Sequence, residues 1–182
     1  MDDGPGVLGL DHPDEADAGR GGPRYTGFML SPSLSVRLAT QLEALATALG
    51  DATPETLAHR PSAGKWSAHE NLAHVARHHE VFLERVERIL SEDAPQIARY
   101  RAEDDPEWPR WAALATATVL DRLKALRQQL VQRVTPLDGA ELARIGVHSA
   151  FGPLPLAAWI EFFLLHEAHH LYVIMGRARG PR

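Results

Sequence analysis

The chain has 182 residues, of which 45% are hydrophobic and 24% are charged, and its formal net charge is −5. These values are typical of one globular domain that is large enough to bury a core of its own. The chain contains no cysteine, which excludes disulfides, thiolate metal ligands and a cysteine nucleophile, so a metal ion would have to be held by nitrogen or oxygen atoms.

Residues 1–27 differ from the rest of the chain. They carry six acidic residues against two arginines, and seven of the 14 glycines. Large apolar side chains are almost absent, so we expect a flexible acidic, glycine-rich arm before a folded domain over residues 28–182. The arm lacks the features of a signal peptide, and the longest apolar run, residues 154–165, is too short to span a bilayer. With no basic stripe either, we expect a cytoplasmic protein that binds neither membranes nor nucleic acid.

The first two predicted helices have clear start signals. Ser31-Pro32 begins a helix over residues 32–50, in which leucines recur at helical spacing until Gly50. Residues 51–64 are predicted to form a loop with one short turn over 54–58. Ser67 and Glu70 form a capping box at the start of a second helix, 67–91. The predicted buried face of this helix consists of Asn71, Val75, His78, Phe82, Val86 and Ile89.

Two further helices are predicted, over residues 109–134 and 155–176, and the segment between them is broken by glycines and prolines. The predicted buried face of the third helix consists of Ala115, Val119, Leu123, Leu126, Leu130 and Val134. Almost nothing in the chain alternates with a period of two. We therefore expect an all-α four-helix bundle with long crossover loops and no sheet of three or more strands.

The most informative motif is the run His166-Glu167-Ala168-His169-His170 in the last helix. Helical residues four apart lie on the same face, so His166 and His170 point the same way. Trp159 and Phe163 fall on that face too, which places both imidazoles on the side that should meet the core. An unpaired polar ring is costly there, and a metal ion would satisfy both rings. A metal site is therefore the leading hypothesis.

The same run also fits two other metal motifs. In His-Glu-x-x-His proteases Glu167 would be the general base, but the metzincin extension needs Gly and His where this chain has Val173 and Gly176. Few residues follow the motif, so the third ligand is expected from upstream. A di-iron bundle needs two Glu-x-x-His units, and only one occurs here. We therefore expect neither a protease nor a ferritin-like protein.

The third ligand should come from the histidines of the second helix. His74 lies at the edge of the predicted apolar arc and His78 lies well inside it, so the periodicity slightly favours His78. His69 and His79 are expected either to be solvated or to lie around the metal ligands. The helical pattern by itself leaves this choice open.

A family resemblance bears on the choice. The run Gly64-Lys65-Trp66-Ser67, followed by Glu70 and His74, resembles the second-helix signature of the DinB/YfiT-like superfamily. Residues 148–154 resemble the loop before that family's last helix, and Trp159 with residues 166–170 resembles the helix itself. The similarity covers about residues 32–177. It implies a four-helix bundle with a three-histidine metal site, whose ligands map onto His74, His166 and His170.

The resemblance also implies a type of chemistry. Three neutral imidazoles leave a coordination position open on Zn²⁺, which is the pattern of a catalytic site. Zinc is the first choice of metal, with nickel, iron and manganese as alternatives. Characterised branches of the family transfer low-molecular-weight thiols such as bacillithiol, mycothiol or glutathione. The resemblance thus implies a metal-dependent thiol transferase acting on a small-molecule electrophile in detoxification or stress response, and a homodimer; no catalytic residue is assigned. A metal-dependent hydrolase and a non-catalytic metal-binding bundle are the alternatives.

Overall fold

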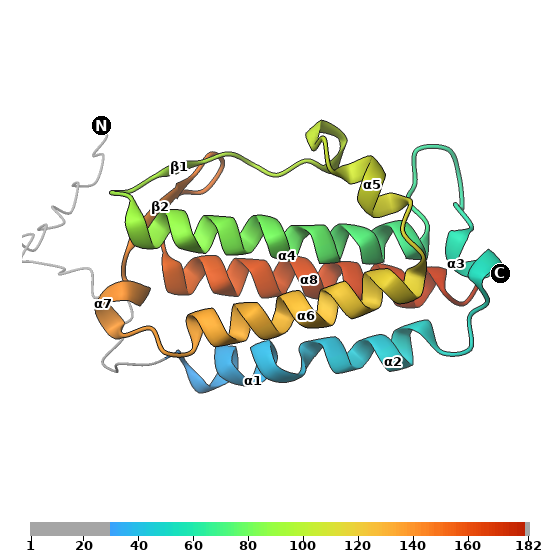
Figure 1. Cartoon of the computed structure of the whole chain (residues 1–182), viewed down its shortest axis with the longest axis horizontal. Helices are drawn as coiled ribbons and strands as arrows, with labels where there is room; N and C mark the ends of the chain where they lie inside the picture. Colours follow the sequence, from blue (N-terminus) through green and yellow to red (C-terminus); the bar gives the residue numbers. More distant parts are fainter. Residues whose placement is uncertain (1–29, 181–182) are drawn as a thin grey trace, which may run out of the picture.

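The computed structural model describes residues 30–180, so the predicted arm over residues 1–27 lies outside the described residues. Long helices packed side by side dominate the molecule (Figure 1). The first side of the bundle is α1 (Pro32–Thr40), the 3-10 turn η1 (Gln41–Glu43) and α2 (Ala44–Leu49). The other three are α4 (Ala68–Ser91), α6 (Thr116–Val134) and α8 (Leu156–Arg177). The predicted all-α four-helix bundle is confirmed.

The order of the helices requires long crossovers. In Figure 1, α4 and α6 run in the same direction, and the chain has to travel back along the bundle between them. This return segment contains η2 (Ala102–Asp104) and α5 (Trp108–Ala112). Helix α8 runs in the opposite direction to α4 and packs directly against it. Two further short helices, α3 (Pro54–Ala58) and α7 (Gly139–Leu142), lie in the other connections.

Helix α4 begins where the sequence predicts. The hydroxyl of Ser67 accepts a hydrogen bond from the Glu70 N–H at 3.1 Å, and the Glu70 carboxylate accepts one from the Ser67 N–H at 2.8 Å. This reciprocal pair satisfies two N–H groups that the first helical turn leaves without partners. All six residues of the predicted buried face of α4 are buried. The orientation of α4, and so of its histidines, therefore follows from its cap and its apolar stripe.

Two of the predicted helices are interrupted in the structure. The helix predicted over residues 32–50 is divided by η1, and Gln41 of that turn points its amide inward to Leu164 and Glu167 of α8. The helix predicted over 109–134 is divided at residues 113–115, because Ala115 has an extended backbone and serves as the N-cap of α6. Ala115 is exposed, so its predicted burial is wrong.

A small sheet closes one end of the bundle, and the expectation of no three-stranded sheet is wrong. Strand β2 (Ile145–His148) pairs antiparallel with β3 (Gly152–Pro155) and parallel with β1 (Gln96–Ile97). The strands have two to four residues, which is too short for a period of two to be recognised in the sequence. The hairpin lies close to α4 and α8: the Trp159 indole N–H donates to the Gly146 carbonyl at 3.1 Å.

The buried apolar residues form separate clusters that follow one another along the bundle. Phe82, Val86 and Ile89 of α4 pack with Trp159 and Phe163 of α8 in one cluster near the sheet. A second cluster toward the other end contains buried residues of α2, α4, α6 and α8. Within residues 30–180, no helix is both long and apolar enough to cross a membrane.

Candidate metal centre

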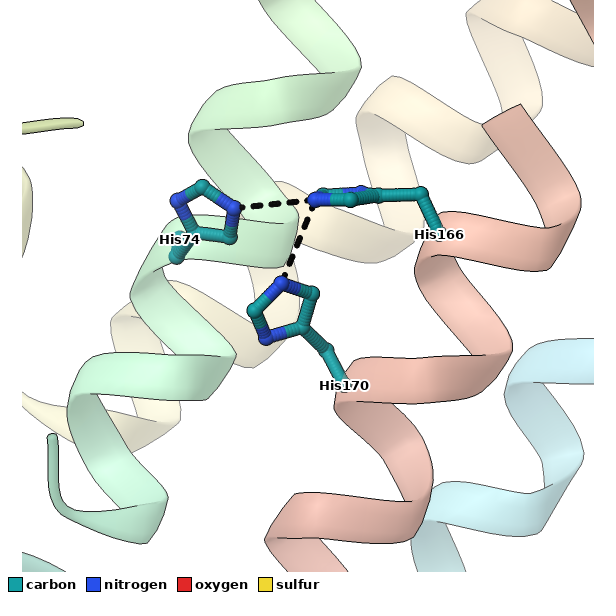
Figure 2. A group of neighbouring side chains, drawn as sticks. All are labelled: His74, His166 and His170. Atoms are coloured by element: carbon teal, nitrogen blue, oxygen red, sulfur yellow. Dashed lines mark hydrogen bonds between the residues drawn. The ribbon is translucent and has the colours of Figure 1, made fainter. Parts of the chain in front are cut away.

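Three histidines from two helices meet inside the bundle, as Figure 2 shows. His74 projects from α4, and His166 and His170 project from successive turns of α8. The Nε2 atom of His166 lies 3.2 Å from Nε2 of His74 and 3.2 Å from Nε2 of His170. The structure therefore brings together the three residues of the predicted ligand set, which we call the histidine cluster.

The spacing of these nitrogens fits a bound metal ion. Two imidazole nitrogens, each about 2.0–2.1 Å from a zinc ion and at a tetrahedral angle, lie about 3.3 Å apart. The two contacts to His166 are 3.2 Å. Three nitrogen donors of intermediate softness suit zinc and other late divalent metals. That these residues bind metal stays a prediction, which the donor set and its spacing support.

A polar chain behind His170 determines which of its nitrogens faces the cluster. The Asn71 amide donates to the Ser67 carbonyl at 2.7 Å, and this carbonyl can only accept. The Asn71 Oδ1 atom must then face His170, where it accepts the proton of Nδ1 at 2.8 Å. The lone pair of the neutral ring is therefore on Nε2, toward the other two histidines. Such an outer hydrogen bond is the usual way in which proteins orient a metal-binding imidazole.

Burial keeps the cluster neutral. Removal from water, together with the smaller effect of the neighbouring histidines, lowers the pKa of His74 to about 3, of His166 to about 4 and of His170 to about 2. At neutral pH all three rings are uncharged, and uncharged imidazole is the form that binds metals.

Aromatic side chains pack around His74 of the cluster. The ring centroids of Trp66 and Tyr100 lie 4.9 and 5.5 Å from that of His74, and Trp108 lies 5.0 Å from Trp66. Tyr100 and Trp108 belong to the return segment between α4 and α6, so this long crossover forms one wall of the site. The wall explains the strong desolvation of His74.

His78, the alternative third ligand, lies beside the cluster. It is buried and its ring centroid is 4.2 Å from that of His166. Its nitrogens are not among those that converge within 4.8 Å, however, and this group consists of His74, His166 and His170. The geometry thus favours the assignment that the family resemblance implied over the one that the helical periodicity favoured.

The remaining two histidines of α4 do not contact the cluster nitrogens. His69 is half-buried and makes hydrogen bonds with the Thr116 hydroxyl and the Ala112 carbonyl, at the junction of α5 and α6. His79 is fully buried, so of the two alternatives expected for it, solvation is excluded and a position around the metal ligands remains. Its Nδ1–H donates to the Val75 carbonyl at 2.8 Å, and its Nε2 lies 3.2 Å from a carboxylate oxygen of Glu167.

Glu167 belongs to a buried ion pair that the sequence analysis missed. Its side chain is 1% exposed and forms an ion pair with Arg127 of α6. It also accepts a hydrogen bond from Gln41 at 2.8 Å. Burial acts to raise the pKa of Glu167, but His79 and Arg127 outweigh it and hold that pKa below its ordinary value. The carboxylate is thus charged and engaged by η1, α4 and α6. The signal for it was present, because Arg127 interrupts the apolar stripe of the third predicted helix.

A cavity of about 320 Å³ opens beside the cluster. His166 lines it, so a molecule in the cavity would contact a member of the cluster. A larger hollow of about 520 Å³ lies near the C-terminal end of α8, and none of the cluster histidines lines it. The smaller cavity is lined by His78, Arg85, Arg99, Tyr100, His148, Ala150, Phe151, Phe162 and His166.

Comparison with known proteins identifies the family. Residues 37–174 match the model of the DinB superfamily. The chain belongs to the DinB superfamily. Its fold is similar to that of YfiT from Bacillus subtilis, described as a probable metal-dependent hydrolase with an unusual four-helix bundle topology. The TM-score is 0.70 with 18% identity, over 94% of each chain.

A second solved structure supports the same fold. TT2238, described as a four-helix bundle protein, has a TM-score of 0.56 and 25% identity, over 78% of this chain and 94% of its own. No curated protein sequence matches the chain. The family and the fold are therefore shown, and the activity of this DinB-superfamily protein has to be argued from its own site.

Proposed function

We propose that this protein is a metal-dependent enzyme that transfers a low-molecular-weight thiol to a small electrophile. His74, His166 and His170 would hold the divalent metal, with zinc as the first choice. The proposal depends on one observation: the Nε2 atoms of His74 and His170 each lie 3.2 Å from Nε2 of His166, next to a cavity that can admit a substrate. Cytoplasmic location, a homodimer and a role in stress response stay predictions.

A divalent ion held by these three histidines would supply Lewis-acid chemistry: it would lower the pKa of a coordinated thiol or water, so that a nucleophile is available near neutral pH. The chain's own residues prepare the site. Asn71 keeps the Nε2 lone pair of His170 directed at the cluster, while Trp66 and Tyr100 exclude water from one side. Because the chain has no cysteine, the thiol must arrive as a substrate.

A metal-dependent hydrolase is the second candidate. It is favoured by the likeness to YfiT, a probable metal-dependent hydrolase whose fold aligns over 94% of this chain. The same three histidines would serve it, with water in place of the thiol. The two reactions differ in the nucleophile, so a single assay series separates them.

The test compares His166→Ala with His169→Ala. The two residues lie on the same helix, but His169 is exposed and is outside the cluster. Each protein is loaded with Zn²⁺, Ni²⁺, Fe²⁺ or Mn²⁺, its metal content is measured, and its reaction with a thiol and 1-chloro-2,4-dinitrobenzene is followed. In this reaction a carbon–sulfur bond forms, chloride leaves, and the thiol proton goes to the buffer. Hydrolysis of 4-nitrophenyl acetate without thiol is the parallel assay.

We expect about one metal ion per wild-type chain and a thiol-dependent rate that His166→Ala abolishes and His169→Ala retains. Asn71→Ala should weaken metal affinity by about 10- to 100-fold, because His170 loses the partner that orients it. Metal-dependent ester hydrolysis without any thiol reaction would establish the hydrolase instead. A fully loaded protein inactive in both assays, or one that binds no metal, would overturn the proposal.

A further inference from the structure

The cavity beside the histidine cluster has a buried positive charge that no acidic side chain neutralises. Arg85 of α4 is 7% exposed. Its guanidinium donates one hydrogen bond, to the Ala98 carbonyl at 2.9 Å, and lies 5.7 Å from the centroid of the Trp159 ring. Within residues 30–180, no carboxylate oxygen lies within 4.0 Å of it. A carbonyl and an aromatic ring hold the guanidinium in place but leave its charge unpaired.

Two other arginines of the bundle, the buried Arg127 and the partly buried Arg77, each have a carboxylate partner. Arg127 forms an ion pair with Glu167, and Arg77 forms one with Asp105 at 2.7 Å. Buried charges in proteins are normally paired, because removing an ion from water is costly. Burial lowers the pKa of Arg85, and the opposing influence of Tyr100 and Glu84, neither of which forms an ion pair with it, does not offset this effect. An unpaired arginine that lines a cavity therefore points to an anion that comes from outside the chain.

Other groups of the cavity also favour an anion. Arg99 lines it with an exposed side chain and adds a second positive charge at the rim. His148 accepts the backbone N–H groups of Ala150 and Phe151 on Nδ1, at 2.9 and 3.2 Å. The neutral ring therefore carries its proton on Nε2, where it can only donate. The cavity thus offers hydrogen-bond donors from three side chains.

No acidic side chain lines the cavity. The proton of the Tyr100 hydroxyl is donated to Asp105 at 2.9 Å, so the donors that the lining offers to an anion are those of Arg85, Arg99 and His148. Ala150, Phe151 and Phe162 contribute apolar surface, and the rings of His78 and His166 complete the lining. At about 320 Å³, the cavity is at the small end of the range for small-molecule sites.

We propose that the cavity binds a small organic carboxylate. Arg85 forms an ion pair with the carboxylate group, and the rest of the molecule extends along the aromatic side chains of the cavity to His166. Arginine presents two parallel N–H groups that match the two oxygens of a carboxylate. This inference rests on the proposed function, since it names the substrate class of the same site. The carboxylate group belongs either to the thiol or to the electrophile with which the thiol reacts, and Arg85 would bind it in the same way in both cases.

Two matched ligand pairs test the proposal on the metal-loaded protein, with affinities measured by ligand-observed NMR. Phenylacetate and its neutral analogue phenylacetamide represent the electrophile. The charged 3-mercaptopropionate and the neutral 2-mercaptoethanol represent the thiol. We expect the carboxylate of at least one pair to bind about tenfold or more tightly than its neutral analogue. The pair that shows this preference identifies the source of the carboxylate.

Variants then assign the preference to Arg85. Arg85→Met removes the charge, and Arg85→Lys retains the charge but loses the two parallel donors, so the preference should disappear in the first and weaken in the second. Arg88→Met is the matched control: it lies on the same helix, is exposed, and pairs with Glu92, so it should bind as the wild type does. Arg99→Met, at the exposed rim, should fold normally and weaken carboxylate binding by a smaller factor than Arg85→Met.

The outcomes are separable from those of the proposed function. Equal binding of both members of both pairs, or a carboxylate preference that persists in folded Arg85→Met, overturns the carboxylate site. Should Arg85→Met fail to fold, unchanged carboxylate binding in Arg85→Lys and Arg99→Met overturns it. The metal content of each sample is measured separately. A protein without metal that still prefers carboxylates through Arg85 would overturn the proposed function and support this site.

Discussion

Glu167 follows His166 directly in the chain, yet the two side chains contact different parts of the bundle. His166 joins the cluster with α4, while Glu167 contacts Arg127, Gln41 and His79. Its carboxylate therefore has neighbours on η1, α4 and α6. These contacts anchor α8 in the orientation in which His166 and His170 face α4. The position of Glu167 in the His-Glu-x-x-His pattern is explained by this anchoring and does not support a role as general base.

Glu167→Gln should destabilise the protein strongly and leave its metal content unchanged. The substitution leaves Arg127 as an uncompensated buried charge, so we expect the free energy of unfolding to fall by about 3–5 kcal/mol. Urea unfolding measures this loss, and elemental analysis measures the metal. Glu161→Gln on the same helix is the control, because the Glu161–Arg37 pair is partly exposed and should contribute under about 1 kcal/mol. Loss of metal without loss of stability would mean that Glu167 acts at the metal.

At the scale of single residues, the sequence predicted side chains whose pattern is local and missed those whose partners are distant. His166 and His170 were found because residues four apart share a helix face. Arg127 stands out because it interrupts an apolar stripe, but its partner Glu167 is 40 positions away, and nothing local identifies that partner. Arg85 was missed for the same reason, since its environment comes from a crossover and a hairpin. The choice of His74 over His78 came from family resemblance, because both lie near the same helical face.

At the scale of elements, Gly146 of β2 shows how closely the sheet approaches the helices. A Cβ atom there would lie 2.7 Å from Ile89 Cγ1 and 2.9 Å from the indole nitrogen of Trp159, too close for either to remain in place. Gly146 lies between α4 and α8 at the end of the bundle that contains the cavity. Only a residue without a side chain allows the hairpin to lie this close.

Gly146→Ala should therefore lower the free energy of unfolding by about 1–3 kcal/mol, because it overpacks the contact between the hairpin and the two helices. Thermal and urea unfolding check this. Gly176→Ala provides the matched comparison: a Cβ atom there meets nothing within 4 Å, and Gly176 lies within α8. Alanine there should raise stability by about 0.5–1 kcal/mol. Equal stability of the wild type and Gly146→Ala would show that the hairpin moves freely away from the helices.

The boundaries of the long helices were predictable and the breaks within them were not. Ser67 with Glu70 and Ser31-Pro32 are local start signals, and α4 and α1 begin there. The division at residues 113–115 has no glycine or proline to mark it. This break allows α5 to bury Trp111 and to place Trp108 against Trp66. The break is therefore set by tertiary packing and not by the local sequence. The short strands are likewise formed by pairing between distant segments.

At the scale of the whole molecule, the buried histidines make folding depend on pH. Their pKa values in the folded protein, about 2 to 4, lie below the ordinary value of 6.5. Below pH 6.5 the unfolded chain takes up protons that the folded protein does not, so stability is present above that pH and falls as the pH decreases. Each histidine contributes a slope of up to about 1.4 kcal/mol per pH unit.

We therefore expect the urea midpoint of the metal-free protein to fall steadily between pH 6.5 and pH 4.5. Replacing one cluster histidine, as in His170→Gln, should make this dependence shallower. His59→Gln changes an exposed histidine and should leave the slope as it is in the wild type. A midpoint that stays constant over this pH range would contradict the burial of neutral rings in the folded protein.

The position of the cluster has a consequence for the lifetime of the molecule. His74 and His166 are 92 positions apart, so an ion bound between them would tie two distant parts of the chain together much as a disulfide does. Only the folded chain presents these nitrogens together, so the ion would shift the balance away from unfolded, protease-sensitive forms. The rate at which the protein is degraded in a cell would then follow the supply of the metal.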